Sequence, residues 1–449
     1  MGSLQRLRIS SNKRFFIKED NTPFFWLGDT AWELIHKLSR DEVDLYLENR
    51  AKNGFTVIQT VALAELDGLR VNNAYGRKPL LKNSVGEYDP TMPDLEVNES
   101  NNYTYWDHLE YVIDKASDFG LYIALLPTWG DKFHLCWGKG PEIFNSENAK
   151  VYGNWLANRL KDKKNIVWVL GGDRQLITAE HFHIINEMAK GIKIGESEEH
   201  LITMHPAGSF SSAYHVHKED WLDFNMIQSG HDRLNNENYK KVSEDYNRNP
   251  IKPVIDAEPR YEDHPINFNT VNGFFDDYDV RQAAFWAVLS GACGHTYGHH
   301  SIWSMCTEPM EYTIMTWKEG INRPGGKQMK YLRGLIESRP FLELIPDQDL
   351  VVQNYTGANF ITAANGKDYA FLYSPNGLKL HVNMGRISGE NVKAYWYNPR
   401  NGESIYIGEK RNDGIEIFMP PSSGRNNDWI LVLDDAKSGY TTPNFNSII

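Results

Sequence analysis

Short apolar runs alternate with amphipathic, helix-like segments along residues 24–303. This alternation is typical of repeated strand-helix units that build a parallel sheet. Eight runs have the length and composition of strands: residues 24–32, 56–63, 121–129, 165–173, 201–208, 224–232, 253–262 and 294–303. Eight such units predict an α/β fold, a (β/α)8 TIM barrel.

The segments between these runs carry helix start and stop signals. Ser39 precedes "RDEVDLYLENRAKNG", where its hydroxyl and Glu42 can form a capping box, and Gly54 supplies the stop. "YWDHLEYVIDKASDFG" (105–120) repeats the pattern and also ends in glycine, and "VRQAAFWAVLSGACG" (280–294) precedes the eighth strand. These signals support the strand-helix repeat.

The pattern changes near residue 343. Beyond it, short alternating runs are separated by Gly, Asn, Asp and Pro, as in an antiparallel β-sandwich. We therefore expect two domains: a barrel with an N-terminal β-hairpin over residues 1–343, and a small β-sandwich over 344–449. The hairpin, in "LRISSNKRFFIKEDNTPFFW", should close one end of the barrel. Tyr395, Trp396 and Tyr397 could form a sugar platform on the sandwich, but their alternation favours a structural role.

The connection between the second and third strands is long and irregular, over residues 64–102. Long insertions in compact domains are usually functional or mobile, and this one follows the C-terminal end of a strand. We expect it to cover the active site.

Two acids stand at the ends of predicted strands. Asp173 follows the fourth, in "IVWVLGGDR", and Glu258 ends the seventh, in "VIDAEPRYE". Two carboxylates facing each other across a barrel mouth suit cleavage of a glycosidic bond, in which one gives a proton and the other attacks or activates water. Structural roles are the alternative: Asp173 could cap the next helix, and Glu258 could pair with Arg260 or Arg174.

The neighbouring residues favour the catalytic interpretation. Gly171 and Gly172 leave space beside Asp173 and permit unusual backbone angles. Alternation puts Asp256 and Glu258 on one face of the seventh strand, with Glu258 nearer the mouth, where Pro259 ends the regular strand.

Composition narrows the class of ligand. The formal net charge of -12 argues against a nucleic-acid partner, which would need clustered basic residues. The 13 Trp and 23 Tyr suit either carbohydrate stacking or a large aromatic core.

No apolar stretch is long enough to span a membrane. "MGSLQRLRIS" lacks the apolar core of a signal peptide and "MGS" resembles an added leader, so we expect an exported protein, periplasmic or at the surface of a polysaccharide-degrading bacterium, whose signal peptide has been removed.

Cofactor motifs do not emerge from the sequence. Cys136, Cys293 and Cys306 lack metal-type spacing, and "LGGDR" is neither GxGxxG nor GK[ST]. His295, His299 and His300 invite a metal interpretation, but neighbouring residues of a strand point to opposite faces. We expect neither a metal nor another cofactor.

Several motifs together resemble a known family. "FFWLGDTAWEL", "NGFTVIQT", "VWVLGGDR", "DAEPRYE" and "RQAAFWAVLSGACGHTYGHHSIW" look like the apiosidase-like catalytic domain of glycoside hydrolase family 140, and "VKAYWYNPRNGE" looks like its companion β-domain. The resemblance implies a retaining hydrolase that releases apiose-linked sugar from the side chains of the pectin rhamnogalacturonan II. It also implies that Asp173 is the acid/base and Glu258 the nucleophile.

Other polar and aromatic residues at strand ends are candidates for binding the sugar. They form an expected ring of substrate-binding side chains: Asp29, Trp32, Glu65, Asp67, Trp129, His205, Gln228, His231 and Tyr297. A plant cell-wall oligosaccharide or polysaccharide is the expected partner, and the protein is expected to be a monomer. Two alternatives stay open: a hydrolase of another pectic or furanosidic glycoside, and a non-catalytic carbohydrate-binding protein.

Overall fold

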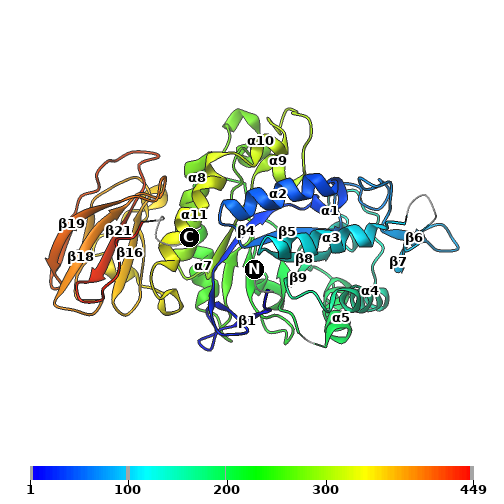
Figure 1. The fold of residues 1–449 in the computed structure, drawn as a ribbon, viewed down its shortest axis with the longest axis horizontal. Coiled ribbons are helices and arrows are strands. Elements are labelled where there is room, and N and C mark those ends of the chain that lie inside the picture. The colour runs from blue at the N-terminus through cyan, green and yellow to red at the C-terminus, as the bar shows by residue number, and fades with distance from the viewer. Residues whose placement is uncertain (1–3, 98–101, 198, 445–449) are drawn as a thin grey trace.

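The computed structural model describes residues 4–97, 102–197 and 199–444. The three opening residues, which resemble an added leader, lie outside these ranges. Within them, the chain forms a barrel flanked on one side by antiparallel sheets (Figure 1).

The predicted strand-helix repeat forms a parallel eight-stranded sheet within the described residues. In chain order its strands are β4 (Trp26–Thr30), β5 (Val57–Leu63), β8 (Tyr122–Thr128), β9 (Ile166–Gly171), β10 (Ile202–His205), β11 (Asn225–Ile227), β12 (Val254–Asp256) and β13 (Gly294–Tyr297). The sheet curls until its two edge strands, β10 and β11, lie side by side. Thr203 Oγ1 donates to Phe224 O at 2.6 Å, and Asp223 N donates to Ile202 O at 2.9 Å, so β10 and β11 close the TIM barrel.

Helices surround the sheet. They are α1 (Leu34–Lys37), α2 (Arg40–Lys52), α3 (Tyr105–Asp118), α4 (Ser146–Leu160), α5 (Ala179–Glu196), α6 (Ala213–Val216), α7 (Asn238–Tyr246), α8 (Asp277–Leu289), α9 (His300–Trp303), α10 (Trp317–Gly320) and α11 (Pro324–Glu337). The capping box predicted at Ser39 and Glu42 is present at the start of α2. No helix in the described ranges is long and apolar enough to cross a membrane.

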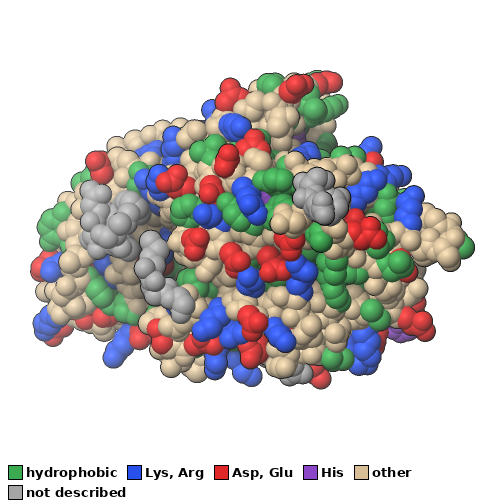
Figure 2. All heavy atoms as spheres, turned by 45° about the vertical axis from the view of Figure 1, so that its right-hand side comes forward, with side chains coloured by type: hydrophobic (Ala, Val, Ile, Leu, Met, Phe, Trp, Pro, Cys, Tyr) green, Lys and Arg blue, Asp and Glu red, His purple; other side chains and the backbone are tan. Residues whose placement is uncertain are grey.

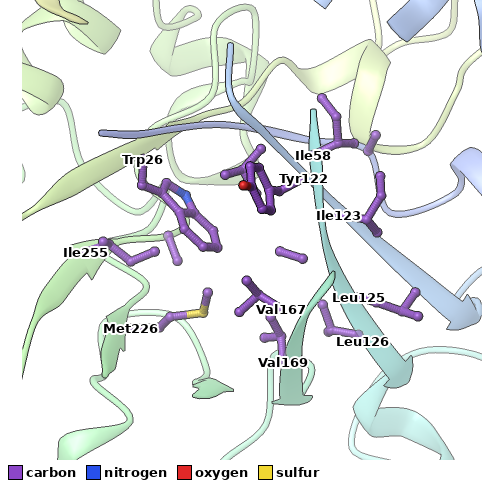
Figure 3. Close-up of a cluster of buried hydrophobic side chains, with 14 of the residues drawn as sticks. Trp26, Ile58, Tyr122, Ile123, Leu125, Leu126, Val167, Val169, Met226 and Ile255 are labelled. Carbon is purple, nitrogen blue, oxygen red and sulfur yellow. The ribbon is translucent and has the colours of Figure 1, made fainter. Parts of the chain in front are cut away.

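Apolar side chains fill the barrel interior. Trp26, Val167, Met226 and Ile255 are buried and converge from four strands (Figure 3). The N-terminal segment closes this core at the N-terminal ends of the barrel strands. It forms β1 (Leu7–Ile9), β2 (Phe16–Lys18) and β3 (Pro23–Phe24). The Phe16 ring lies 5.7 Å from Trp26 and 4.9 Å from Phe224, so the predicted closure of one barrel end is observed.

The long connection after β5 differs from its expected role. It forms the hairpin β6 (Leu80–Lys82) and β7 (Tyr88–Pro93), which projects from the side of the barrel away from the C-terminal sheets (Figure 1). Of its described residues, only Glu65 lines the cavity described below. The expectation that this connection covers the site is therefore wrong, because its hairpin projects to the side, where it lines a separate hollow together with residues 141–148.

The C-terminal part is built of antiparallel sheets. Its described strands form a six-stranded sheet and a two-stranded sheet that packs on it. They are β14 (Ile345–Pro346), β15 (Thr362–Asn365), β16 (Tyr369–Ser374), β18 (Asn391–Tyr397), β19 (Ser404–Arg411) and β21 (Trp429–Asp435) in the first, and β17 (Leu380–Asn383) and β20 (Ile415–Phe418) in the second. Trp396 packs between the two sheets, whereas Tyr395 and Tyr397 join the core shared with the barrel. These aromatics are buried and offer no exposed platform.

The surface carries charges of both signs. On the face that Figure 2 shows, acidic and basic side chains of the described residues are interspersed in small groups. In this view the described residues show no large patch of Lys and Arg alone.

Candidate active site

A cavity of about 550 Å³ opens at the C-terminal ends of the barrel strands. Its walls come from segments that follow each of the eight strands, and both Asp173 and Glu258 line it. The volume lies within the usual range for small-molecule sites, about 300–1,000 Å³. The barrel therefore brings the two predicted acids into one cavity.

Asp173 reaches the cavity through a strained turn at the end of β9. Gly171, Gly172 and Asp173 have φ values of 88°, 93° and 59°. A Cβ on Gly171 would lie 2.5 Å from His205 O, and one on Gly172 would lie 2.8 Å from Gly130 N. Glycine is thus required twice, because side chains there would be both strained and blocked. The turn directs the Asp173 carboxylate to Trp137, whose Nε1 donates to Oδ2 at 3.1 Å.

Glu258 reaches the cavity because the seventh strand does not continue to it. The regular strand β12 ends at Asp256, and the next two amides, of Ala257 and Glu258, both point at Ile227 O, at 2.8 and 3.4 Å. This doubling resembles a β-bulge, which turns the chain. Asp256 consequently faces outward, where Ser229 Oγ and Asn238 Nδ2 each donate to it at 2.8 Å. The prediction that Asp256 and Glu258 share a face is wrong.

Two histidines flank the Glu258 carboxylate. His231 Nε2 hydrogen-bonds with Oε1 at 3.2 Å. His205 Nε2 lies 3.1 Å from Oε2, although the two atoms lack hydrogen-bond alignment. Burial alone would raise the pKa of Glu258, but the two histidines reverse this and hold it well below its usual range.

The pKa of Asp173 moves in the opposite direction. Burial and the neighbouring Glu258 raise it to about 6, against the smaller lowering influences of His205, Arg174 and the Trp137 hydrogen bond. Below about pH 6, Asp173 therefore keeps its proton while Glu258 stays ionised. Such a divergence is how two carboxylates take separate acid and nucleophile roles.

A third carboxyl group, Glu65, lines the same cavity. Burial, followed by the charges of Asp173, Glu33 and Asp131, raises its pKa to about 8. Glu65 is therefore mostly protonated at neutral pH and can donate a hydrogen bond to a ligand.

Aromatic rings form one wall of the cavity. The rings of Trp32 and Trp129 lie 5.1 Å apart, and the Trp32 ring lies 5.3 Å from that of His205. The lining also contains Tyr261 and His264, whose rings lie 4.4 Å from that of His231. A flat apolar face with polar groups beside it suits a sugar ring.

The structure brings most of the expected sugar-binding residues to this site. Trp32, Glu65, Trp129, Gln228 and His231 line the cavity, and His205 contacts Glu258 behind it. Gln228 Oε1 is buried without a hydrogen-bond partner among the described residues, so it is available to a ligand.

The structure does not bring Asp29, Asp67 or Tyr297 to the cavity lining. The carboxylate of Asp29 accepts a hydrogen bond from Tyr46 at 2.5 Å and lies 3.5 Å from Arg50, both on α2. The hydroxyl of Tyr297 donates to Glu262 at 2.6 Å. Both point outward from the barrel because they alternate with the inward Trp26 and Thr296, which are hydrogen-bonded to each other. Asp67 pairs instead with Arg70 at 2.6 Å.

Sequence reasoning missed several cavity residues that lie beyond the barrel strands, in loops and short helical turns. They include Trp137, Gln175, Tyr261, His264, Phe268 and Trp303. Such segments carry no regular alternation of apolar and polar residues. The available signal was the clustering of aromatic and histidine residues at or after the ends of the predicted strands, as in "LCWGKG" and "PRYEDHP".

The histidines considered for a metal have separate environments. His299 pairs with Asp263 at 3.0 Å, His300 lines the cavity, and His295 is buried. In the part of the chain that the structure describes, no group of three or more His, Cys, Asp or Glu residues is placed to hold a metal ion.

Comparison with known proteins identifies relatives over nearly the whole chain. Residues 10–343 match the family model "Apiosidase-like, catalytic domain", and residues 345–434 match the model "Putative collagen-binding domain of a collagenase". A solved structure described as "Glycoside hydrolase" is 34% identical, with 97% of this chain and 98% of that chain covered and a TM-score of 0.86. A structure described as a glycoside hydrolase family 5 protein from Bacteroides vulgatus is 31% identical, with coverages of 98% and 95% and a TM-score of 0.88. No curated protein sequence matches the chain.

Proposed function

Because the chain belongs to the family of apiosidase-like catalytic domains and is a glycoside hydrolase, we propose that it cleaves apiosyl linkages in the side chains of rhamnogalacturonan II with retention of anomeric configuration. The proposal includes membership of glycoside hydrolase family 140. The observation that carries it is the pair of acids in one cavity, where the pKa of Asp173 is raised to about 6 and the pKa of Glu258 is held below its usual range.

The mechanism has two displacements. The Glu258 carboxylate attacks the anomeric carbon while the bond to the leaving oxygen breaks and that oxygen takes the proton of Asp173. This step produces a glycosyl ester on Glu258 and leaves Asp173 as a carboxylate. Asp173 then removes a proton from water, the water oxygen attacks the anomeric carbon, and Glu258 departs as a carboxylate.

The surrounding groups support this division of roles. A nucleophile must be ionised in the free enzyme, and the two histidines beside Glu258 favour that form. We assign sugar stacking to Trp32 and Trp129, and hydroxyl binding to Glu65, Gln228 and His231, all of which line the cavity.

Release of apiose-linked sugar from rhamnogalacturonan II oligosaccharides tests the substrate and the acid pair together. Wild type should release the sugar, and Asp173→Ala and Glu258→Ala should each lower the rate at least about a thousandfold, because each loses a group that reacts. Asp413→Ala, which removes an exposed acid from the C-terminal sheets, is the control and should retain the wild-type rate. Undiminished release by Glu258→Ala would contradict the assignment.

Stereochemistry tests the retaining mechanism separately. Proton NMR of the first-formed sugar should show the anomeric configuration of the substrate. Azide should restore turnover of an activated glycoside by Asp173→Ala with a retained glycosyl azide product, because azide attacks the glycosyl ester without base assistance. An inverted first product would mean that water, and not Glu258, attacks the anomeric carbon. If wild type cleaves other pectic or furanosidic glycosides but no apioside, the roles of Asp173 and Glu258 are retained and the substrate assignment is wrong.

A further inference from the structure

Trp137 lies at the mouth of the cavity beside the proposed acid/base. It belongs to the loop between β8 and α4, lines the cavity and is 47% exposed. Its Nε1 donates to Asp173 Oδ2 at 3.1 Å. Among the described residues, Asp173 is the hydrogen-bond acceptor of this indole nitrogen.

Arg174 fixes the position of this indole. The Arg174 side chain is buried, and its Nε and Nη2 donate to His134 O at 2.8 Å and to Trp137 O at 2.6 Å. Its guanidinium carbon also lies 4.2 Å from the centre of the Trp137 ring, against one face. The indole is nonetheless 47% exposed and lines the cavity, so the part of the ring that Arg174 leaves uncovered can receive a ligand.

We propose that Trp137 forms the leaving-group subsite, with its open face stacking on the leaving sugar and its N–H tuning the acid/base Asp173. The inference rests on the proposed function. The acid must lie next to the oxygen that it protonates, and the leaving sugar is attached to that oxygen. A ring that is hydrogen-bonded to the acid and exposed at the rim is therefore adjacent to the leaving sugar.

The same hydrogen bond couples binding to chemistry. When Asp173 gives up its proton, the Trp137 N–H becomes a charge-assisted donor to the carboxylate, which strengthens the bond. The donor therefore lowers the pKa of Asp173 and opposes the raising influence of burial and Glu258. Trp137 is a positioning residue for proton transfer and a binding residue for the leaving group.

Two substitutions separate these roles. Trp137→Phe keeps an aromatic face and removes the N–H, whereas Trp137→Ala removes both. Phe268→Ala serves as a comparison, because Phe268 is also an exposed aromatic residue lining the cavity, but its ring packs against His231 and His264 and has no N–H to donate to Asp173. Melting temperatures of all three variants confirm folding.

The first measurement is a pH titration of Asp173 in the free protein. Carbon-13 NMR of labelled aspartate side chains reports the protonation of the carboxyl group. Trp137→Phe should raise the pKa of Asp173 by about half a unit or more, because the donor to the carboxylate is lost, and Phe268→Ala should leave it unchanged. The same shift should move the high-pH limb of kcat/KM upward. An unmoved Asp173 titration in Trp137→Phe would overturn the tuning role whatever the substrate is.

The second measurement compares two substrates with the same apiosyl group, a rhamnogalacturonan II oligosaccharide and apiosyl fluoride. Fluoride needs neither a platform nor a proton to leave. Trp137→Ala should lower kcat/KM for the oligosaccharide about tenfold more than for the fluoride, corresponding to about 1.4 kcal/mol of stacking. Equal losses on both substrates would overturn the subsite. Absence of activity in wild type itself would instead count against the proposed function.

Discussion

Glu258 and Asp173 occupy one cavity, yet their carboxyl groups have different environments. The two histidines beside Glu258 stabilise its charged form, whereas Asp173 is half-buried with few donors and faces the negative charge of Glu258. Each residue thus influences the titration of the other. A bell-shaped dependence of kcat/KM on pH follows, because Glu258 must be ionised and Asp173 protonated.

The pH profile should fall as pH rises through about 6, where Asp173 loses its proton, and again at low pH, where Glu258 gains one. His231→Phe keeps a ring in place and removes the nitrogen that contacts Glu258. The pKa of Glu258 should rise, so the low-pH limb should move to higher pH and the bell should narrow.

His181→Phe is the control for His231→Phe, since the His181 ring contacts His134 and lies outside the cavity. The pH dependence of kcat/KM, measured for both variants, shows whether the low-pH limb moves in His231→Phe alone. A low-pH limb that stays in place in His231→Phe would show that His231 does not stabilise the Glu258 carboxylate.

At the scale of elements, the ends of β9 and β12 leave regular strand geometry where the acids stand. Three successive positive φ angles, beginning at Gly171, end β9, and a bulge-like turn follows β12. Strained backbone of this kind persists where the surrounding structure enforces it, and it is common at active sites. Here it rotates both carboxylates toward the same space.

Gly172→Ala tests the turn after β9. The new methyl group would lie 2.8 Å from Gly130 N at a φ of 93°, so strain and collision combine. We expect the free energy of unfolding to fall by about 2 kcal/mol or more, and activity to fall because Asp173 is displaced.

Gly76→Ala separates strain from collision, since its φ is 72° and no described atom lies within 4 Å of the position that the new methyl group would take. It should cost about 1 kcal/mol and leave activity unaffected. Urea denaturation and initial rates measure both effects. Equal losses of stability and activity in the two variants would show that the close packing around Gly172 is unimportant.

At the scale of the whole molecule, buried ion pairs join the barrel to the C-terminal sheets. Arg281 on α8 contacts Asp428 at 2.9 Å, and Arg339, which follows α11, contacts Asp434 on β21 at 2.7 Å. The rings of Tyr239 and Phe360 stack at 4.1 Å across the same boundary. The two parts should therefore unfold together.

Arg339→Met tests this coupling. It would leave the Asp434 carboxylate buried without its partner, which should lower the free energy of unfolding by about 3–5 kcal/mol. Arg411→Met removes an equally short but exposed pair with Asp413 and should have little effect. Urea denaturation followed by tryptophan fluorescence measures both, and similar midpoints for the two variants would contradict a stabilising interface.

The sequence by itself determined the repeat of strands and helices, the change to antiparallel strands and the two acids at strand ends. These features are local: alternation, caps and glycines act over a few residues, and parallel strands place their C-terminal ends together. Counting alternation from Trp26 would also have turned Asp29 outward, since residues three apart face opposite sides of a strand.

Only the tertiary structure decided which groups meet. The doubled amides that turn Glu258 inward depend on contact with Ile227 on the neighbouring strand, and Trp137 reaches Asp173 from a loop 36 residues earlier in the chain. The opposite pKa shifts of the two acids depend on burial and on charges brought from separate strands. Distances across a barrel are set by packing between segments remote in sequence, and no local pattern encodes them.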